Sequence, residues 1–117
     1  MAAEVRTLEA FFTAPPATST LLIAELPDGT RVGFVYLEEL RDYFTLVAHG
    51  HVGMLVVNED AEGRGIGGAL MRAAEAWARE RGYRKLTLTV FGTNHAAQAI
   101  YQHLGYGLET LRYVKTL

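Results

Sequence analysis

The sequence predicts an α/β fold in which a mixed, mostly antiparallel sheet is flanked by helices. Three observations support this class. The chain has 117 residues, half of them hydrophobic, which suits one domain with one core. Runs rich in β-branched residues and segments with helical periodicity follow one another without a repeat. A glycine cluster at residues 63–68 lies between one such run and an amphipathic helical stretch. We therefore expect a single domain over residues 1–117.

The first predicted element is a helix. Its apolar residues recur at helical spacing and are Val5, Leu8, Phe11 and Phe12. The helix has to end before Pro15, because a residue that precedes proline is biased away from the helical conformation. Residues 13–20 then form a loop.

Strand patterns follow as far as residue 57. Residues 21–26 and 31–40 are β-rich, and the sequence Pro-Asp-Gly at residues 27–29 between them predicts an antiparallel hairpin. Residues 43–48 either extend this sheet or cross over it. Residues 52–57 have the composition of a buried strand, and we expect them in the centre of the sheet.

The second half of the chain alternates helix and strand. The most regular helix spans residues 65–81, and Gly82 follows it where a glycine commonly ends a helix. Its apolar face comprises Ile66, Ala69, Leu70, Ala73 and Trp77. Residues 85–91 alternate Leu and Thr as a strand does, and residues 94–104 follow as a second helix. Its predicted inner face comprises Ala97, Ile100 and Leu104. Residues 108–115 close the sequence as a strand.

Composition excludes several classes of protein. The chain has no cysteine, which rules out disulfides, thiolate metal sites and cysteine nucleophiles, and its four histidines lack metal-ligand spacing. We expect no metal. No apolar run approaches the ~20 residues of a membrane span, and no signal peptide is recognisable, so we expect a cytoplasmic protein with no membrane partner. A net charge of −2 without a basic stripe argues against nucleic-acid binding.

Charge is distributed unevenly along the chain. Residues 1–60 hold three basic and nine acidic side chains, a net charge of −6. Residues 61–85 hold six basic and three acidic side chains, a net charge of +3. A cationic ligand beside the first segment and a polyanionic ligand at the second are both favoured, although two differently solvated faces explain the same pattern.

The glycine cluster predicts an anion-binding turn. Glycines at a strand-to-helix junction let backbone N–H groups point inward, and the following helix adds the positive end of its dipole. We expect a pyrophosphate there. The glycines also match G-x-G-x-x-G, which raises the alternative of a dinucleotide-binding domain. However, residues 58–62 separate them from the strand, and strand 85–91 ends without an acidic residue to bind a ribose.

Two motifs resemble those of the GNAT superfamily of acyl-CoA N-acyltransferases. The first is Arg64-Gly65-x-Gly67. The second, roughly thirty residues further on, is Asn94-x-x-Ala97-x-x-x-Tyr101-x-x-x-Gly105-Tyr106. The likeness extends from about Leu21 to the C-terminus. It implies the GNAT fold with a shortened N-terminus, and an N-acetyltransferase that transfers an acetyl group from acetyl-CoA to a primary amine.

The resemblance also implies roles for individual residues. The strand ending at Val57 would diverge from strand 85–91, and the pantetheine arm of acetyl-CoA would lie in the opening. Tyr101 would stand near the sulfur and protonate the leaving thiolate as a catalytic acid. Asn94 would hydrogen-bond the pantetheine, although helix capping alone would also explain it. The implied cofactor-binding residues are Leu55, Val56, Val57, Gly63, Arg64, Gly65, Ile66, Gly67, Gly68, Asn94 and Tyr101. Without a cysteine nucleophile, the amine would attack the thioester directly in a ternary complex.

Several groups are candidates for the general base. Many GNAT proteins carry carboxylates on the strand before the glycine turn, whereas this chain has Gly53 and Met54. His51 shares a strand face with Gly53, which leaves it room to reach an amine, and we name it as the catalytic base. Glu38, Glu39 and a chain of water molecules are the other candidates.

The sequence departs from the family at two further places. Glu62 stands where the family often has Arg or Gln. Only about twenty residues precede Leu21, where the family commonly has a strand and two helices that shape the acceptor site. We expect a second subunit of a homodimer to supply that wall. The alternative function is a non-catalytic acyl-CoA-binding or regulatory module. The remaining histidines, expected to be exposed and without a role, are His49, His95 and His103.

Overall fold

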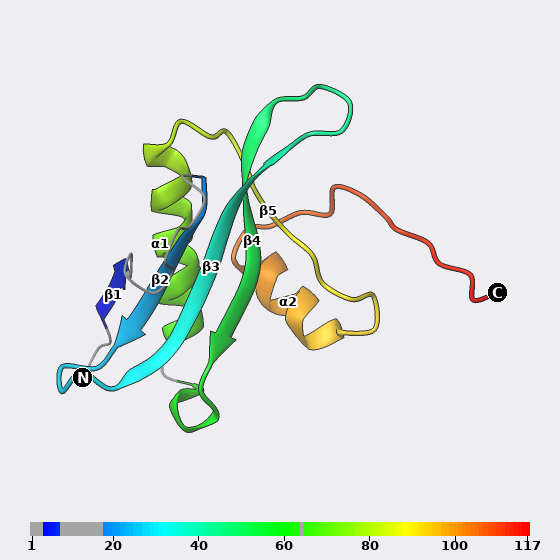
Figure 1. Cartoon of the computed structure of the whole chain (residues 1–117). Coiled ribbons are helices and arrows are strands. Elements are labelled where there is room, and N and C mark those ends of the chain that lie inside the picture. The colour runs from blue at the N-terminus through cyan, green and yellow to red at the C-terminus, as the bar shows by residue number, and fades with distance from the viewer. Residues whose placement is uncertain (1–3, 8–17, 64) are drawn as a thin grey trace.

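The computed structural model describes residues 4–7, 18–63 and 65–117, which form one five-stranded sheet (Figure 1). Its order is β1-β2-β3-β4-β5, and neighbours are antiparallel except for β4 and β5, which are parallel. The strands are β1 (Glu4–Thr7), β2 (Thr20–Glu25), β3 (Arg31–Arg41), β4 (Ala48–Val57) and β5 (Leu86–Leu88). The helices are α1 (Ile66–Glu80), α2 (His95–His103) and the short 3-10 turn η2 (Glu59–Ala61). The predicted mixed, mostly antiparallel sheet with helices is confirmed.

The predicted hairpin is confirmed as β2 and β3. Gly29 adopts a φ of 90° in the connecting turn and donates its N–H to the carbonyl of Leu26 at 2.8 Å. The N–H of Thr30 donates to Asp28 Oδ1 at 2.9 Å. Glycine accepts a positive φ without strain, and an aspartate side chain satisfies nearby backbone amides. This local chemistry ends β2 and sets the register of β3.

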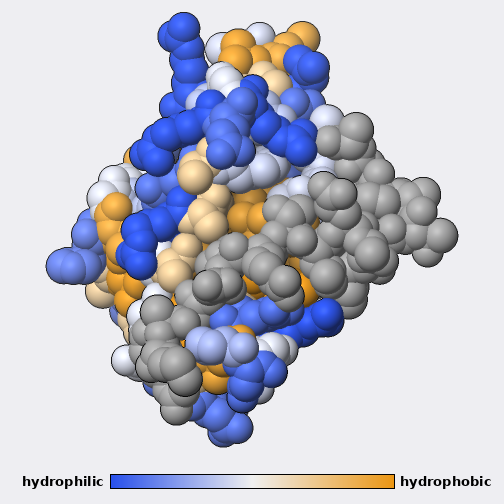
Figure 2. Space-filling model, turned by 90° about the vertical axis from the view of Figure 1, so that its left-hand side faces the viewer, coloured by the Kyte–Doolittle hydropathy of each residue, from blue (hydrophilic) through white to orange (hydrophobic). Residues whose placement is uncertain are grey.

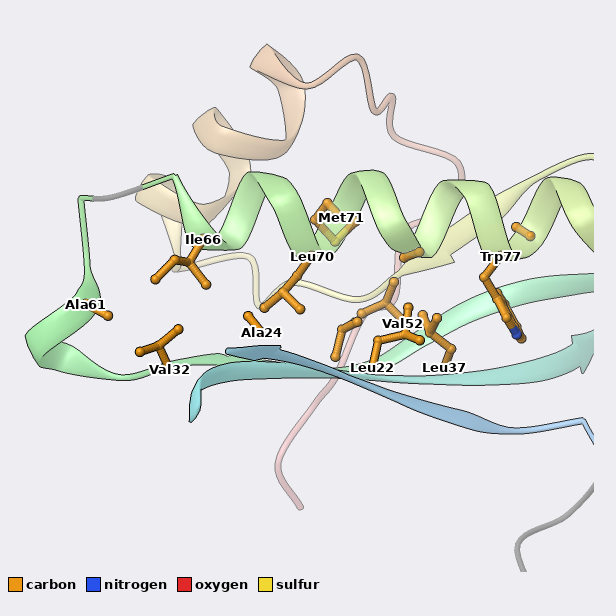
Figure 3. Close-up of a cluster of buried hydrophobic side chains, with 13 residues drawn as sticks. Leu22, Ala24, Val32, Leu37, Val52, Ala61, Ile66, Leu70, Met71 and Trp77 are labelled. Carbon is orange, nitrogen blue, oxygen red and sulfur yellow. The ribbon is translucent and has the colours of Figure 1, made fainter. Parts of the chain in front are cut away.

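The hydrophobic core lies between α1 and the sheet (Figure 3). α1 buries one apolar stripe, whose members are Ile66, Leu70, Met71, Ala74, Trp77 and Ala78. Val35 and Leu37 on β3 are fully buried beneath it, as is Leu70 on the helix. Gly50 lets α1 approach β4 closely, because a Cβ at this position would lie 2.8 Å from Trp77 Cζ3. The helix predicted over residues 65–81 is therefore confirmed. Of its predicted apolar face, Ile66, Leu70 and Trp77 are buried, whereas Ala69 and Ala73 are only partly buried.

The N-terminal prediction is wrong for residues 4–7. They form β1 instead of a helix, and Val5 lies opposite Ala24 of β2. A free sheet edge that can pair with the backbone outweighs a few apolar residues at helical spacing. Residues 8–12 of the predicted helix, and most of the loop expected after it, lie outside the described residues.

The segment predicted to extend or cross the sheet is instead the loop between β3 and β4. Asp42 Oδ1 accepts hydrogen bonds from the N–H groups of Phe44 at 2.9 Å and Thr45 at 3.1 Å. A turn held by an aspartate side chain outweighs the β-type composition of these residues. The loop has exposed apolar side chains at its apex, which is the orange surface at the top of Figure 2. These apolar side chains are Phe44, Leu46 and Val47, and the exposed ring of Tyr43 lies beside them.

The second half of the chain also differs from prediction in detail. β5 is shorter than expected, and β4 is only partly buried, since Met54 is 54% exposed. α2 is confirmed as a helix but contains no buried residue, and Ile100 is 59% exposed. Residues 108–115 form no strand; they continue as an exposed, extended segment (Figure 1). A β-type sequence becomes a strand only beside a partner, and the pattern of residue types does not reveal whether one is available. No helix within the described residues is long and apolar enough to span a membrane.

Candidate functional site

β4 and β5 pair over a short stretch and then separate. Their register joins Gly50–Val52 to Leu86–Leu88, whereas β4 continues to Val57 alongside β3. A bulge in the β3–β4 pairing skips Gly53, and from there on β4 has no partner on its β5 side within the described residues. The structure thus places an open strand edge where the sequence analysis expected a divergence.

The turn after β4 leads into the open N-terminus of α1. Gly63 and Gly65 have φ values of 81° and 76°, which side chains rarely adopt. No side chain caps the helix and its first turn holds no acidic residue. The N–H of Ala69 bonds to the carbonyl of Gly65 at 3.0 Å, which leaves the amides of residues 66–68 without an acceptor inside the helix. Such amides, at the positive end of a helix, suit an anionic ligand.

Arg72 adds positive charge over this turn. Its Nη1 atom would lie 3.3 Å from a Cβ placed on Gly68, so the guanidinium folds back towards the open end of α1. Arg72 was not among the predicted site residues. Its spacing of four residues from Gly68 was the available signal, since such residues are neighbours on a helix. Arg64, the cation that was predicted, lies outside the described residues.

Asn94 caps α2. Its Oδ1 atom accepts a hydrogen bond from the N–H of Ala97 at 3.1 Å. The capping interpretation is therefore confirmed. The amide group Nδ2 retains two donors, so a contact with a ligand is compatible with the cap and stays a prediction.

Tyr101 is half-buried and packs against the core on the α1 side of the sheet. Its ring lies 6.0 Å from that of Tyr106 in an edge-on arrangement, and the Tyr106 hydroxyl donates to Glu75 Oε2 at 2.7 Å. Burial raises the pKa of Tyr101 above its ordinary value. The hydroxyl therefore stays protonated at neutral pH, as a proton donor must.

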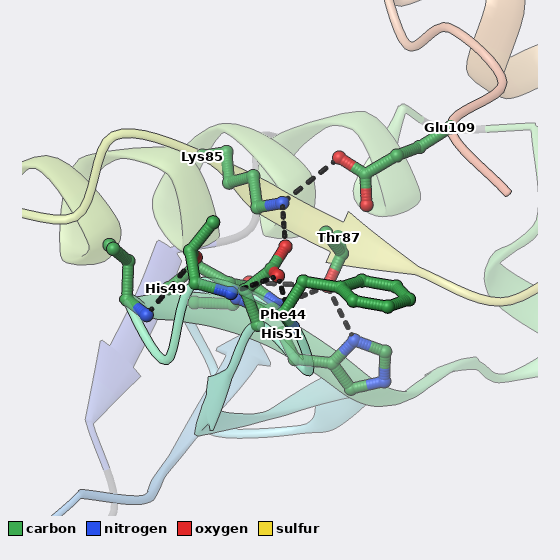
Figure 4. Close-up of polar contacts among 10 residues, drawn as sticks. Phe44, His49, His51, Lys85, Thr87 and Glu109 are labelled. Carbon is green, nitrogen blue, oxygen red and sulfur yellow. Dashed lines mark hydrogen bonds and ion pairs between the residues drawn. The ribbon is translucent and has the colours of Figure 1, made fainter.

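His51 lies on the opposite face of the sheet, because its neighbours on β4, Gly50 and Val52, face the core. Its Nδ1 atom is 2.7 Å from Thr87 Oγ1 on β5 (Figure 4). Glu38 of β3 lies directly across from it in the register. Burial lowers the pKa of His51, and the negative charge of Glu38 offsets part of this effect. The imidazole is consequently neutral at pH 7 and able to accept a proton.

The two glutamates proposed as bases lie on different faces. Glu39 faces α1, where its Oε1 accepts a hydrogen bond from the Tyr83 hydroxyl at 2.7 Å. Glu38 faces the His51 side, since Gly53 on that face lies near it: a Cβ on Gly53 would be 3.6 Å from Glu38 Cδ. The structure therefore groups Glu38 with His51 and separates Glu39 from them.

The expectation that His49 is exposed is wrong. Its exposed fraction is 8%, and its Nε2 atom lies 3.1 Å from Thr87 Oγ1. Strand alternation puts it on the same face as His51, and the pairing with β5 brings Thr87 over both. Thr87 was missed because its place beside them follows from the parallel register. His95 and His103 are exposed, as expected. In the described parts of the chain, no cluster of three His, Asp or Glu side chains suits a metal ion.

Comparison with known proteins gives this geometry a context. Residues 2–106 match the sequence profile described as the Acetyltransferase (GNAT) family. The chain belongs to the GNAT family. The aminoglycoside N(6')-acetyltransferase type 1 of Klebsiella aerogenes is 35% identical to this GNAT chain over 91 residues. That alignment covers 75% of the chain and 59% of the Klebsiella protein, so the chain spans about three fifths of this relative's length.

Solved structures share the fold of this GNAT chain. A putative acetyl transferase from Pyrococcus furiosus superposes with a TM-score of 0.84 at 23% identity. The superposition covers 98% of this chain and 99% of the Pyrococcus chain. AAC(6')-Iy in complex with the bisubstrate analogue CoA-S-monomethyl-acetylneamine superposes with a TM-score of 0.79 at 17% identity, with both chains fully covered. At these identities the likeness concerns the fold alone.

Proposed function

We propose that this chain is an acetyl-CoA-dependent N-acetyltransferase that transfers the acetyl group to a primary amine by direct attack in a ternary complex. The observation that carries the proposal is the open β5 side of β4, residues 53–57, which the glycine-rich turn connects to the uncapped N-terminus of α1. Strand amides there suit an extended amide-containing arm, and the helix end suits a pyrophosphate. Family membership, and a neighbour of the same fold solved with a CoA-containing analogue, support the choice of acetyl-CoA.

The residues present fit acetyl-CoA, and different groups would bind its different parts. Backbone groups of residues 55–57 would pair with the pantetheine, and the amides from Gly63 to Gly68, with Arg64 and Arg72, would hold the phosphates. Asn94 would contact the arm beyond them. When bound, acetyl-CoA supplies the activated acetyl group as a thioester.

Proton transfer is the chemistry left to the side chains. An alkylamine with a pKa near 10.4 is protonated about a thousandfold at neutral pH, which withholds its lone pair. Neutral His51, with Glu38 beside it, would accept the amine's proton. Tyr101, approaching from the α1 side, would donate a proton to the leaving thiolate. Because the pKa of His51 is lowered, the midpoint of the acid-side fall in turnover should lie below the ordinary histidine value of 6.5.

The acceptor we favour is a cationic amine. Residues 1–60 carry a net charge of −6, and Glu38 faces the candidate base. The Klebsiella relative, by its name, acetylates an aminoglycoside, which is a polyamine of this kind. The expected homodimer stays a prediction, which light scattering at micromolar concentration tests.

A thermal-shift titration with acetyl-CoA, followed by an amine panel monitored for release of free thiol, tests the proposal. Stabilisation by acetyl-CoA and thiol release with at least one amine are expected. The rival interpretation is a non-catalytic acyl-CoA-binding module, favoured by Gly53 and Met54 at positions where many relatives carry carboxylates. Stabilisation without thiol release from any amine would support that module, and absence of stabilisation would contradict both.

A further inference from the structure

The Thr87 hydroxyl lies between two imidazoles on the face of the sheet away from α1 (Figure 4). Its Oγ1 atom is 2.7 Å from His51 Nδ1 and 3.1 Å from His49 Nε2. A third, longer contact of 3.4 Å joins it to the carbonyl of Gly50. One small side chain on β5 therefore contacts two titratable groups of β4.

The chemistry of a hydroxyl restricts how these contacts are made. Thr87 has one proton to donate and two lone pairs that accept. The Gly50 carbonyl can only accept, so all three contacts are made at once only if Thr87 donates to it. Both imidazoles then donate to Thr87, His51 through Nδ1–H and His49 through Nε2–H. The lone pair of His51 is left on Nε2.

The surroundings of His49 support this arrangement. Its Nδ1 atom is buried and has no hydrogen-bond partner among the described residues. If His49 accepted from Thr87, its proton would sit on Nδ1, as a buried N–H group without an acceptor. Orphaned buried N–H groups are rare in folded proteins. The Nε2–H tautomer avoids such an orphaned donor, and in this form His49 donates to Thr87.

We infer that Thr87 is a positioning residue: its hydroxyl, held by His49, keeps His51 as the Nδ1–H tautomer and turns Nε2 towards the acceptor amine. This inference rests on the proposed function. Protonation of Nε2 by the amine breaks an N–H bond of the ammonium and forms one on the imidazole. The Nδ1–H bond to Thr87 is kept, so the imidazolium needs no new partner on that side.

The groups facing His51 come from its own strand, β4, and from the two strands beside it, β3 and β5. Glu38 and Tyr36 approach from β3, since a Cβ on Gly53 would lie 3.6 Å from the carboxyl carbon of one and 3.0 Å from the ring of the other. His49 lies on β4 and Thr87 on β5. Glu38 raises the pKa of His51, while burial and a charge on His49 lower it. Thr87 carries no charge, so its removal acts through the tautomer and orientation of His51.

Nitrogen-15 NMR of the imidazoles tests the inference on the protein itself, with the His51 signals assigned from His51→Gln. In the wild type above pH 7 we expect a protonated Nδ1 and an unprotonated Nε2. Thr87→Val keeps the side-chain shape, removes the hydroxyl and should lose this preference, whereas Thr87→Ser should restore it. A wild-type His51 protonated on Nε2, or a Thr87→Val variant that keeps Nδ1–H, would overturn the inference.

Kinetics give the second readout. In Thr87→Val we expect kcat to fall at least about tenfold, part of the ~10²–10⁴ that a positioned base contributes, with the KM for acetyl-CoA unchanged. Thr87→Ser should recover most of kcat and show the same fall in turnover at acidic pH as the wild type. Equal loss in both variants, or none in Thr87→Val, would contradict a positioning role. If the wild type releases no thiol with any amine, the proposed function fails, whereas the tautomer measurement still decides the role of Thr87.

Discussion

Replacing Gly65 with alanine separates the ligand-binding role of the glycine turn from its effect on folding. Gly65 has a φ of 76°, and a Cβ placed there would meet no atom within 4 Å. The penalty is then purely conformational, about 1–2 kcal/mol for an alanine in the left-handed region. For a domain of this size that lowers Tm by about 4–8 °C. Gly82, at the other end of α1, offers a matched control: its φ is 78° and its Cβ position is equally open.

Gly65→Ala and Gly82→Ala should therefore lose similar stability, measured by thermal unfolding, yet differ in affinity for acetyl-CoA, measured by isothermal titration calorimetry. A hydrogen bond to a charged group contributes about 1.5–3 kcal/mol, so displacing one amide of the turn should weaken binding by roughly 10- to 100-fold. Gly82→Ala should bind as the wild type does. Full affinity in Gly65→Ala, or an equal loss of affinity in both variants, would refute a ligand-binding role for the glycine turn.

Four further outcomes follow from the structure. Tyr101→Phe should lower kcat by about 10²-fold or more while acetyl-CoA affinity stays unchanged, since only the proton donor is lost. Leu70→Ala, at a fully buried position, should lower the free energy of unfolding by about 2–5 kcal/mol in urea titrations. Glu39→Gln weakens the hydrogen bond from Tyr83 and should lower Tm without changing kcat or its pH profile. Backbone amides lower the pKa of Asp42 from 3.8 to about 2, so its charged form stabilises the fold above pH 3.8 and this contribution disappears towards pH 2. In Asp42→Asn, Tm should depend less on pH across that window.

Each of these outcomes has a clear contrary result. Full turnover in Tyr101→Phe would remove the tyrosine from catalysis. A loss in Leu70→Ala of less than 1 kcal/mol would contradict the burial of this side chain. A shifted pH profile in Glu39→Gln would return that glutamate to the list of bases, and an unchanged acid dependence in Asp42→Asn would mean that its hydrogen bonds contribute little.

The sequence predicted best the features that local chemistry determines. The Pro-Asp-Gly turn, the glycine-rich turn, the amphipathic stripe of α1 and the cap by Asn94 each depend on residues a few positions apart. The position of Glu39 was harder to predict from the sequence. It and Glu38 are adjacent in sequence, and only the alternation of β3 relative to α1 shows that one faces His51 and the other Tyr83.

Other features depend on partners that no local pattern reveals. Val5 lies in β1 because the edge of β2 is available to pair with it. Residues 108–115 have the composition of a strand but no neighbouring strand in the described chain. Thr87 looks like one more alternating residue until the parallel register brings it beside the imidazoles of β4. Long-range pairing, more than propensity, was the missing information.

The three-residue seam between β4 and β5 has a mechanical consequence. Because only three residues of each strand pair, the last third of the chain has few backbone hydrogen bonds to the rest of the sheet, so amide hydrogen exchange should be fastest along this join. A ligand whose own amides bridged the two strands would close that join and slow exchange on both sides of it. The join would then become more rigid as more of the protein binds the ligand, and resistance to proteolysis would increase with ligand concentration.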